Sequence, residues 1–324
     1  MIKRIFSTVL MTVSLFAVTG LPLQAADYPT QNIRIVVPYP PGGPTDIAAR
    51  LMAAVFERAL GRTVVIENKS GAGGTIGAQE VARAAPDGHT LLVNASAHVI
   101  SPAITRDMKY DVIKDFTPIT QLVSVPLMLL INPSVPARDV RELIAYAKAN
   151  PGKLSFASSS RGSAPHFAGE LFKQLAGIDI VHVPYRGAAP ALTDLMSGQV
   201  QIMFDSMSSA AGHVQSGALR ALAISTPERS GLLPELPTMK EAGVPDFVIT
   251  NWYGLWAPKN TPPDVVNKLV EALNAGFKSP LITERLRAIG AEPVISPADD
   301  FASFCIREKE FWQKIATAAN VEKE

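Results

Sequence analysis

Cysteine is the scarcest residue in the sequence: Cys305 is the one cysteine among 324 residues. No intrachain disulfide can therefore form, and a chain of this length buries enough apolar surface to fold without one. Cys305 lies in a pattern typical of a helix, with Phe301, Trp312 and Ile315 near the same face. This placement predicts a buried structural thiol, because a cysteine packed among apolar side chains behaves as a small hydrophobe.

An excess of charge of one sign is also lacking. The chain carries 30 Lys and Arg against 29 Asp and Glu, a formal net charge of +1. It therefore shows no electrostatic footprint for nucleic acid, and we expect no nucleic-acid partner. Charged residues make up 18% and hydrophobic residues 47%, a balance that suits a packed globular protein and argues against disorder.

Motifs of the common enzyme classes are missing. There is no G-x-S-x-G, no H-E-x-x-H and no paired cysteine motif, and the five histidines lack the spacing of metal ligands. Gly71 to Gly77 resembles a dinucleotide fingerprint, but its spacing is G-x-G-x-x-x-G and the next predicted strand ends in Asn94-Ala95, without an acidic residue for a ribose. We therefore predict that the protein is not an enzyme and that it binds neither a metal nor a cofactor. The glycines still allow backbone N–H groups to approach an anion at a helix N-terminus.

The first 25 residues differ from the rest of the chain. Lys3 and Arg4 precede the apolar stretch Ile5 to Val18, and Leu23-Gln24-Ala25 follows as an imperfect cleavage site. This layout is typical of a secretory signal peptide, and the apolar stretch is too short and too interrupted by Ser and Thr for a good membrane span. We therefore predict a signal peptide over 1–25 and a soluble, exported mature chain. An uncleaved amphipathic start is the alternative.

Strand and helix patterns alternate along the mature chain. Strands are predicted at 33–37, 63–67 and 90–93, with helices at 46–60 and 75–84 between them. The remaining predicted elements, in chain order, are 139–149, 154–157, 165–176, 181–183, 190–197, 200–204, 208–215, 221–225, 248–257, 263–275 and 297–318. Strands separated by single helices indicate an α/β fold with a parallel sheet covered by helices on both faces.

Prolines and glycines are concentrated between the first predicted strand and the first predicted helix. The segment 35–47 reads IVVPYPPGGPTDI, in which an apolar run stops at three prolines and two glycines. Two interpretations stay open: a plain strand-to-helix turn, or a loop that directs bare backbone N–H groups at a solute. Ligands of open parallel sheets bind at the carboxyl ends of the strands, and this loop follows such an end.

Other loops at predicted strand ends carry polar side chains. Ser158 to Ser163 is either a solvated loop or a source of hydroxyl and amide donors, and Ser163 is placed to cap the next helix. His166 lies in the first turn of that helix and either touches a ligand or packs inside. In Tyr185-Arg186-Gly187, the planar cation of Arg186 either contacts a ligand or is only a surface charge. Asp205 either receives an ammonium or hydroxyl group of a ligand or caps the following helix.

Five segments follow the export signal in a specific order: PYPPGGPTD, NKSGAGGTIGA, VPYRG, GQVQIMFDS and NWYGLWAP. With these segments the chain resembles the solute receptors of tripartite tricarboxylate transporters, the Bug family, over essentially the whole mature chain. The resemblance implies a type II periplasmic-binding-protein fold, in which two α/β domains face each other across a cleft and two crossover strands join them. It also implies a periplasmic receptor that captures a small organic carboxylate by hinge closure and delivers it to the membrane subunits of the transporter.

The resemblance also defines domain boundaries and partners. Domain 1 is expected over 27–125 plus 248–324 and domain 2 over 126–247, with hinges near 121–126 and 250–255. The expected ligand is a dicarboxylate, an acidic amino acid or an aromatic acid, bound by a monomer. The family pattern places a ligand carboxylate against the loop before the first helix, partly through bridging waters.

The expected ligand-binding residues come from the resemblance together with the strand-end loops. In domain 1 they are Tyr39, Pro40, Gly42, Gly43, Thr45, Asp46, Ser70, Gly73, Ala95 and Ser96. In domain 2 they are Ser158, Ser160, Ser163, His166, Tyr185, Arg186, Gly187 and Asp205. The carboxylate of Asp46 would repel an anion, so we expect it to cap the helix or to accept a hydrogen bond from water or a ligand hydroxyl.

Two other functions compete with transport. The same pair of domains would serve equally well as a ligand-dependent signalling partner that presents its closed form to a membrane sensor, because both roles need the same cleft. An exported hydrolase would require a nucleophile with an adjacent base, and Ser159 or Ser160 with His166 is the pair that the sequence offers.

Overall fold

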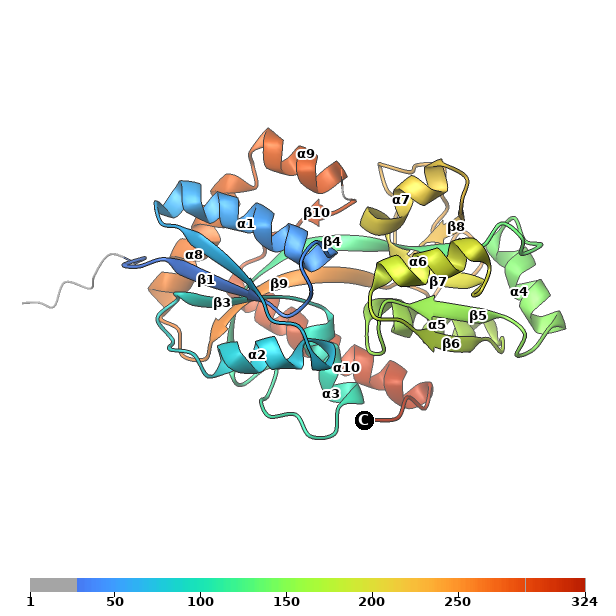
Figure 1. The fold of residues 1–324 in the computed structure, drawn as a ribbon, viewed down its shortest axis with the longest axis horizontal. Coiled ribbons are helices and arrows are strands. Elements are labelled where there is room, and N and C mark those ends of the chain that lie inside the picture. Colours follow the sequence, from blue (N-terminus) through green and yellow to red (C-terminus); the bar gives the residue numbers. More distant parts are fainter. Residues whose placement is uncertain (1–27, 289, 324) are drawn as a thin grey trace, which may run out of the picture.

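The computed structural model describes residues 28–288 and 290–323, which form two α/β domains joined by long strands (Figure 1). The predicted signal peptide and its cleavage site lie outside these residues. The strands are β1 (Ile33–Val37), β2 (Val64–Asn68), β3 (Thr90–Ala95), β4 (Phe116–Ile131), β5 (Ser155–Ser158), β6 (Val181–Pro184), β7 (Ile202–Ser206), β8 (Arg220–Ile224), β9 (Thr250–Pro258) and β10 (Glu292–Pro293). The helices are α1 (Pro44–Leu60), α2 (Thr75–Ala82), α3 (Ala97–Ile104), α4 (Val140–Ala149), α5 (Ala164–Ala176), α6 (Ala188–Ser197), α7 (Met207–Gln215), α8 (Pro263–Gly276), α9 (Pro280–Ala288) and α10 (Ala298–Ala318), with a short 3-10 helix, η1 (Ala72–Gly74).

Domain 1 is built on the first three strands. β1 lies between β2 and β3 and pairs in parallel with both, and β9 then pairs antiparallel with β3. The side chains of Ile33, Ile35, Val36 and Val37 are fully buried, which fits a strand covered by helices on both faces. The helices α1 and α8 pack against each other, and α2 lies beside β3, as the left-hand half of Figure 1 shows.

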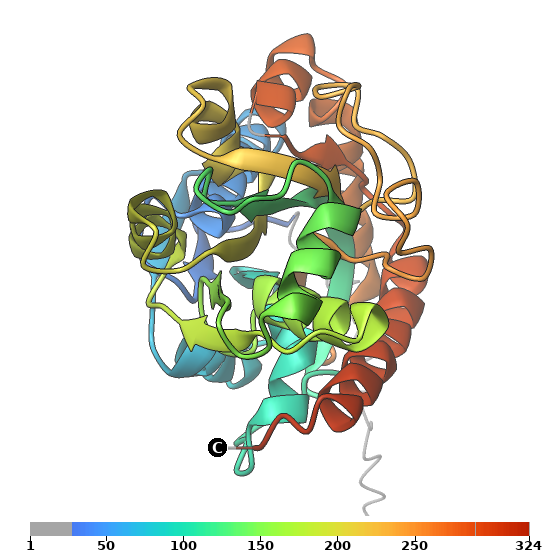
Figure 2. The same cartoon turned by 90° about the vertical axis from the view of Figure 1, so that its right-hand side faces the viewer.

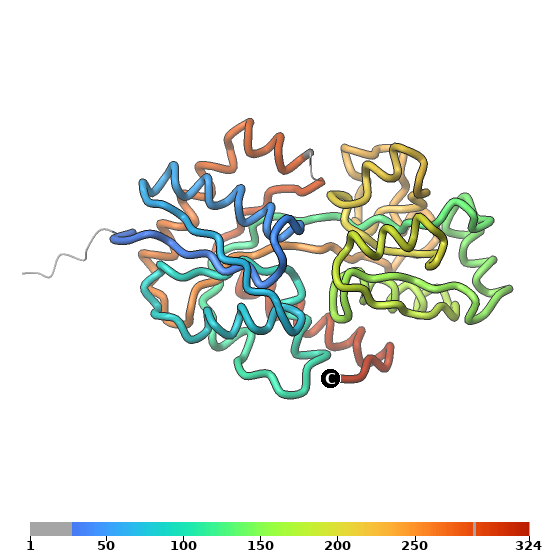
Figure 3. The backbone as a smooth tube through the Cα atoms, in the orientation of Figure 1, coloured from blue at the N-terminus to red at the C-terminus, as the bar shows by residue number. Residues whose placement is uncertain are grey.

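The strand β4 belongs to both domains. Its first part, Phe116 to Pro126, pairs antiparallel with β9. Its second part, Leu127 to Ile131, pairs antiparallel with β7, and Met128 to Ile131 also pair with β8. Because β4 changes partners between Pro126 and Leu127, one continuous strand passes from one sheet to the other (Figure 3). β9 runs beside it, so the two crossover strands of the predicted type II fold are confirmed.

Domain 2 completes its sheet around β4. The order is β6–β5–β7–β4–β8, with β5 parallel to both β6 and β7. Phe156, Phe172, Phe204 and Phe247 are fully buried, and the rings of Phe204 and Phe247 stack at a centroid distance of 5.1 Å. The chain thus alternates strand and helix here, as its sequence pattern predicts.

The last helix, α10, spans the two domains. It packs against α3 in domain 1 and reaches α5 in domain 2, where the rings of Trp312 and Phe167 lie 5.5 Å apart. Figure 2 shows it running along one side of the molecule to the C-terminal segment near α3. Glu308 accepts hydrogen bonds from the indole N–H groups of Trp252 in β9, at 2.8 Å, and Trp312, at 2.9 Å. Cys305 is 1% exposed, which confirms the predicted buried thiol, and burial raises its pKa to about 12.

Some predicted elements needed correction. The first helix begins at Pro44 rather than at Asp46, because a proline is well accommodated in the first turn. The last helix begins at Ala298, with Pro297 as its N-cap rather than its first helical residue. The helices α3 and α9 and the whole length of β4 were not predicted. In the part of the chain that the structure describes, no helix is both long and apolar enough to cross a membrane.

Candidate functional site

The candidate site consists of the loops that follow the parallel strands of each domain. In domain 1 these loops join β1 to α1, β2 to α2 and β3 to α3, and in domain 2 they join β5 to α5, β6 to α6 and β7 to α7. The carboxyl ends of parallel strands share one edge of a sheet, where such folds bind ligands. The β1–α1 loop lies at the end of domain 1 that faces domain 2 (Figure 3).

The N-termini of five helices at these loops have no side-chain cap among the described residues. Their N-cap residues are Gly43 (α1), Gly74 (α2), Ser96 (α3), Gly187 (α6) and Ser206 (α7). The first N–H groups of a helix have no partner within the helix, and they carry the positive end of its dipole. Backbone donors suited to an anion therefore occur in both domains. In contrast, Ser163 caps α5, and its side chain accepts a hydrogen bond from the His166 amide, as predicted.

Asp46 holds the β1–α1 loop in place. The carboxylate is 1% exposed and accepts hydrogen bonds from Gly42 N at 2.9 Å, Arg50 Nε at 2.8 Å and Asn68 Nδ2 at 3.0 Å. Burial alone would raise the pKa of Asp46, but these three hydrogen bonds, with the charge of Arg50, lower it below its usual range. Asn68 also donates to Tyr39 O at 3.0 Å, so the end of β2 fixes both sides of the loop. The charge of Asp46 is thus balanced by protein groups, and a ligand contact at Asp46 stays a prediction.

Tyr39 connects this loop to the other strand ends of domain 1. Its hydroxyl donates to Asn94 Oδ1 at 3.0 Å, and the same oxygen accepts from Ala95 N at 2.8 Å. A Cβ on Gly74 would lie 3.2 Å from the Tyr39 hydroxyl, and the backbone of Gly74 has φ +96°. Glycine is therefore required at position 74 both for its conformation and for the close approach of the tyrosine.

A chain of hydrogen bonds leads from the β3–α3 loop of domain 1 along β9 toward domain 2. Ser96 donates its hydroxyl to Asn251 Oδ1 at 3.0 Å, and Asn251 Nδ2 donates to Tyr253 Oη at 3.3 Å. The Tyr253 hydroxyl also lies close enough to the side chain of Ser206, at the end of β7, to interact with it. Burial and then the nearby charge of Asp205 raise the pKa of Tyr253 above its usual range. The crossover strand thus carries polar groups that link the two halves of the candidate site.

Asp205 is a buried carboxylic acid next to this chain of hydrogen bonds. It is 2% exposed and accepts a hydrogen bond from the Ser209 hydroxyl at 2.5 Å. Burial raises its pKa to about 6, although hydrogen bonds from Ser209 and the Ser206 backbone partly oppose the shift. The Asp205 carboxyl group therefore changes its charge near pH 6, and only its protonated form can donate a hydrogen bond.

The serine-rich loop of domain 2 rests on two stacked histidines. The rings of His166 and His182 lie 4.0 Å apart, and Ser158 Oγ lies 2.7 Å from His182 Nε2. Gly162 N donates to His166 Nδ1 at 3.2 Å, which fixes that nitrogen as an acceptor. Burial, followed by the charge of His182, lowers the pKa of His166 to about 3, so its ring is neutral. Within the described residues no hydroxyl of Ser159 or Ser160 is hydrogen-bonded to His166, the contact that the hydrolase hypothesis requires.

The β6–α6 loop presents a hydroxyl and a cation. The Tyr185 hydroxyl donates to Asp194 Oδ2 at 2.7 Å, and Gly187 N donates to Ser159 O at 2.7 Å. Burial, then the hydrogen bond to Asp194, raises the pKa of Tyr185 to about 12. The side chain of Arg186 is exposed to solvent. This loop is therefore tied to the serine-rich loop while Arg186 extends from it.

The predicted ligand-binding residues differ in their exposure to solvent. Exposed positions are Pro40, Gly42, Ser70, Gly73 and Arg186. Buried positions are Thr45, Asp46, Ala95, Ser96, Ser158, Ser163, His166 and Asp205. Half-buried positions are Tyr39, Gly43, Ser160, Tyr185 and Gly187. No group of three or more His, Cys, Asp or Glu side chains suited to a metal occurs among the residues that the structure covers.

Sequence reasoning missed four polar residues that organise the site: Asn68, Asn94, Asn251 and Tyr253. Asn94 had a usable signal, since it is a polar residue that directly follows an apolar strand on the binding edge. Asn251 and Tyr253 lie within the quoted segment NWYGLWAP, but the sequence alone does not indicate which of its side chains face the loops.

Comparisons with known proteins agree on one family. Residues 48–321 match the family described as tripartite tricarboxylate transporter family receptor. Protein BugT of Bordetella pertussis is 38% identical over 293 residues, which cover 90% of this chain and 90% of BugT. Among solved structures, R. palustris Rpa4515 with adipate is similar with a TM-score of 0.86 at 36% identity, covering 92% of this chain and 100% of that one. MatC from Rhodopseudomonas palustris with bound malate has a TM-score of 0.80 at 35% identity, covering 89% and 99%.

Proposed function

The chain belongs to the tripartite tricarboxylate transporter receptor family, whose members are periplasmic solute-binding proteins, and we propose that it captures a small dicarboxylate for such a transporter. In this proposal the ligand binds between the two domains in the periplasm, and the loaded protein delivers it to the membrane subunits. The observation that carries the proposal is the set of five helix N-termini without side-chain caps, in both domains, at the strand-end loops.

The backbone N–H donors can bind an anion tightly enough even though the site contains few cationic side chains. A helix N-terminus contributes about 0.3–1 kcal/mol, and each hydrogen bond to a charged group about 1.5–3 kcal/mol. A micromolar receptor needs about 8 kcal/mol. Two N-termini and about four such hydrogen bonds reach this range, with bridging waters nearly as effective as direct donors. Arg186 would then supplement the backbone donors.

A dicarboxylate fits the distribution of donors better than a monocarboxylate. Uncapped N-termini occur on both sides, at α1, α2 and α3 in domain 1 and at α6 and α7 in domain 2. We therefore assign one carboxylate to the β1–α1 loop and the other to the domain 2 loops. The relatives solved with adipate and malate hold molecules with two carboxylates each, which supports this assignment.

Hinge closure follows from the same arrangement. β4 changes sheets between Pro126 and Leu127, so rotation about this point would bring the two sets of loops together. A ligand that is held by one domain first and then by donors of the other favours the closed state by its extra contacts alone. The division predicted at 125/126 and 247/248 is the one that we propose for the moving bodies.

A thermal-shift screen of the mature chain tests this function. Malate, adipate and citrate are compared with acetate, glucose and lysine. At about 100 times the dissociation constant a ligand stabilises by about 2.7 kcal/mol, which corresponds to roughly 5 °C in melting temperature. We expect this shift with malate or adipate, and a smaller one with acetate. If glucose or lysine raises the melting temperature while no carboxylate does, the proposal is wrong.

A further inference from the structure

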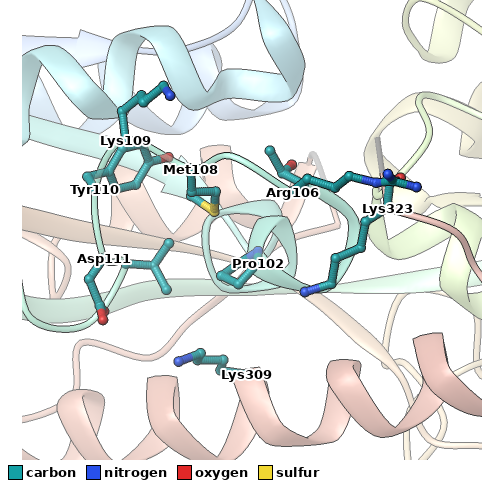
Figure 4. A pocket seen from close by; sticks show the side chains of 10 residues that line it. Pro102, Arg106, Met108, Lys109, Tyr110, Asp111, Lys309 and Lys323 are labelled. Atoms are coloured by element: carbon teal, nitrogen blue, oxygen red, sulfur yellow. The ribbon is translucent and has the colours of Figure 1, made fainter.

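A second polar surface is formed by residues outside the predicted ligand site. A hollow of about 470 Å³ lies between the end of α3, the loop 105–112, α10 and the C-terminal segment. Four cations line it, Arg106, Lys109, Lys309 and Lys323, with the single carboxylate of Asp111 (Figure 4). None of these residues belongs to the strand-end loops of the candidate site. The hollow therefore offers a local excess of positive charge on a chain with almost no net charge.

The carboxylate in the hollow is already engaged. Asp111 Oδ1 accepts hydrogen bonds from the backbone N–H groups of Ile113 at 2.8 Å and Lys114 at 3.0 Å. Figure 4 shows the side chains of Lys309 and Lys323 on the side of Pro102 that faces α10, whereas Lys109 extends elsewhere. The ammonium groups of Lys309 and Lys323 thus lie beside the apolar ring of Pro102. This arrangement suits a ligand that combines negative charge with an apolar side chain.

The C-terminal segment that carries Lys323 is attached to both domains. Arg106, which follows α3 in domain 1, donates from Nε to Lys323 O at 2.9 Å. Arg161, in the serine-rich loop of domain 2, donates from Nη2 to Glu322 O at 2.6 Å. A rotation of one domain relative to the other must therefore stretch or move one wall of the hollow. The shape of the hollow depends on the same domain arrangement that ligand binding would change.

The size of the electrostatic contributions indicates what kind of molecule binds here. An exposed ion pair is worth about 0.2–1 kcal/mol, so a small free anion that pairs with both Lys309 and Lys323 gains at most about 2 kcal/mol. Millimolar affinity already requires about 4 kcal/mol. A protein segment with several carboxylates and an apolar residue adds hydrophobic contact and long-range attraction. The hollow therefore suits an acidic protein segment better than a free solute.

We propose that this basic hollow is the docking surface for an acidic segment of a membrane subunit of the transporter, and that docking there responds to the arrangement of the two domains. The identity of the partner rests on the function proposed above. The attachment of the 322–323 segment to Arg106 and Arg161 is the structural link between the ligand site and this surface.

Fluorescence anisotropy of the full mature chain with a labelled peptide of alternating glutamate and leucine tests the docking surface. At low ionic strength we expect the double variant Lys309→Glu/Lys323→Glu to bind the peptide about tenfold more weakly than the wild type. The matched control, Lys153→Glu/Lys240→Glu, makes the same change in net charge at two exposed lysines of domain 2 and should bind normally. Equal losses in both double variants, or no binding by the wild type, would overturn the proposal.

A second measurement tests the response to the ligand site. Saturating malate or adipate is expected to change the peptide affinity by about threefold or more, because two linked equilibria share one coupling free energy. Arg161→Gln should reduce this effect. A peptide affinity that is the same with and without a bound carboxylate would overturn the coupling. The thermal shift with malate or adipate, expected to persist in Lys309→Glu/Lys323→Glu, reports separately whether the proposed solute-binding function holds.

Discussion

Ser96 in the β3–α3 loop donates its hydroxyl to Asn251 Oδ1 in the crossover strand β9 at 3.0 Å. Asn251 in turn donates to the Tyr253 hydroxyl, which lies near the side chain of Ser206 from domain 2. One asparagine on a strand between the domains therefore fixes a loop of one half of the site and, through Tyr253, contacts the other half. Strain or motion at this strand would reach both sets of loops.

The Ser96–Asn251 contact predicts a measurable coupling between these two residues. Asn251→Ala should destabilise the fold by about 1–3 kcal/mol, because it leaves the buried Ser96 hydroxyl without its acceptor. Ser96→Ala should cost about 0.5–1.5 kcal/mol. In a double-mutant cycle measured by urea unfolding, we expect an interaction free energy of about 0.5 kcal/mol or more. Strictly additive effects would show that the two side chains act independently.

Two adjacent glycines should separate binding from folding. Gly43 has φ −76°, and a Cβ there would lie at an ordinary 3.6 Å from Pro40 O, so Gly43→Val should keep the fold. It would place a branched side chain over the N-terminus of α1, and we expect calorimetry to show about tenfold weaker binding of malate or adipate. Gly42 has φ +81°, so Gly42→Ala should instead lower the free energy of unfolding by about 1 kcal/mol.

The pair of glycine variants has a clear contrary result. If Gly43→Val binds both dicarboxylates as tightly as the wild type, the β1–α1 loop has only a structural role. If Gly42→Ala is as stable as the wild type, the positive φ at this position carries no strain. The pair also controls for general damage, because the two substitutions lie in the same loop.

Periodicity was sufficient to predict most strands and helices, but not all elements. No strand was predicted where β4 lies. Its second part is buried throughout and therefore shows no alternation of polar and apolar residues. The helix α3 contains Pro102, which argues against a helix when only the sequence is considered. The fold class could be predicted because alternating strands and helices have few topologies, and the ordered loop segments added the family.

The polar partners within the site were beyond prediction for a different reason. Ser96 and Asn251 are 155 residues apart in the chain, and nothing in the local sequence of either indicates the other. The local contact between Ser163 and the His166 amide, in contrast, follows from capping rules and was predicted. Sequence reasoning therefore located the loops of the site, whereas the contacts that hold them together depend on how distant strands pair.

Asp46 should stabilise the β1–α1 loop only while it is charged. Because hydrogen bonds from Arg50, Gly42 and Asn68 lower its pKa in the folded state, its contribution is present above the unfolded-state pKa of about 3.9 and is lost as the pH falls through the lower folded value. Asp46→Asn should therefore cost about 1–3 kcal/mol at neutral pH and clearly less near pH 3, as measured by urea unfolding at each pH. A cost that does not change with pH would contradict this account.

Asp205 should give a pH dependence of the opposite sign. Burial raises its pKa from 3.8 to about 6, so between these values the folded state keeps a proton that the unfolded state has released. Stability contributed by this group therefore falls as the pH rises from about 4 to about 6, by up to roughly 3 kcal/mol. Asp205→Asn removes this titration, so the stability of the variant relative to the wild type should be higher at neutral pH than below pH 4. Urea unfolding at both pH values tests this prediction, and Asp46→Asn is the control for which the sign is opposite. If the relative stability of Asp205→Asn is equal at both pH values, Asp205 titrates normally in the folded protein.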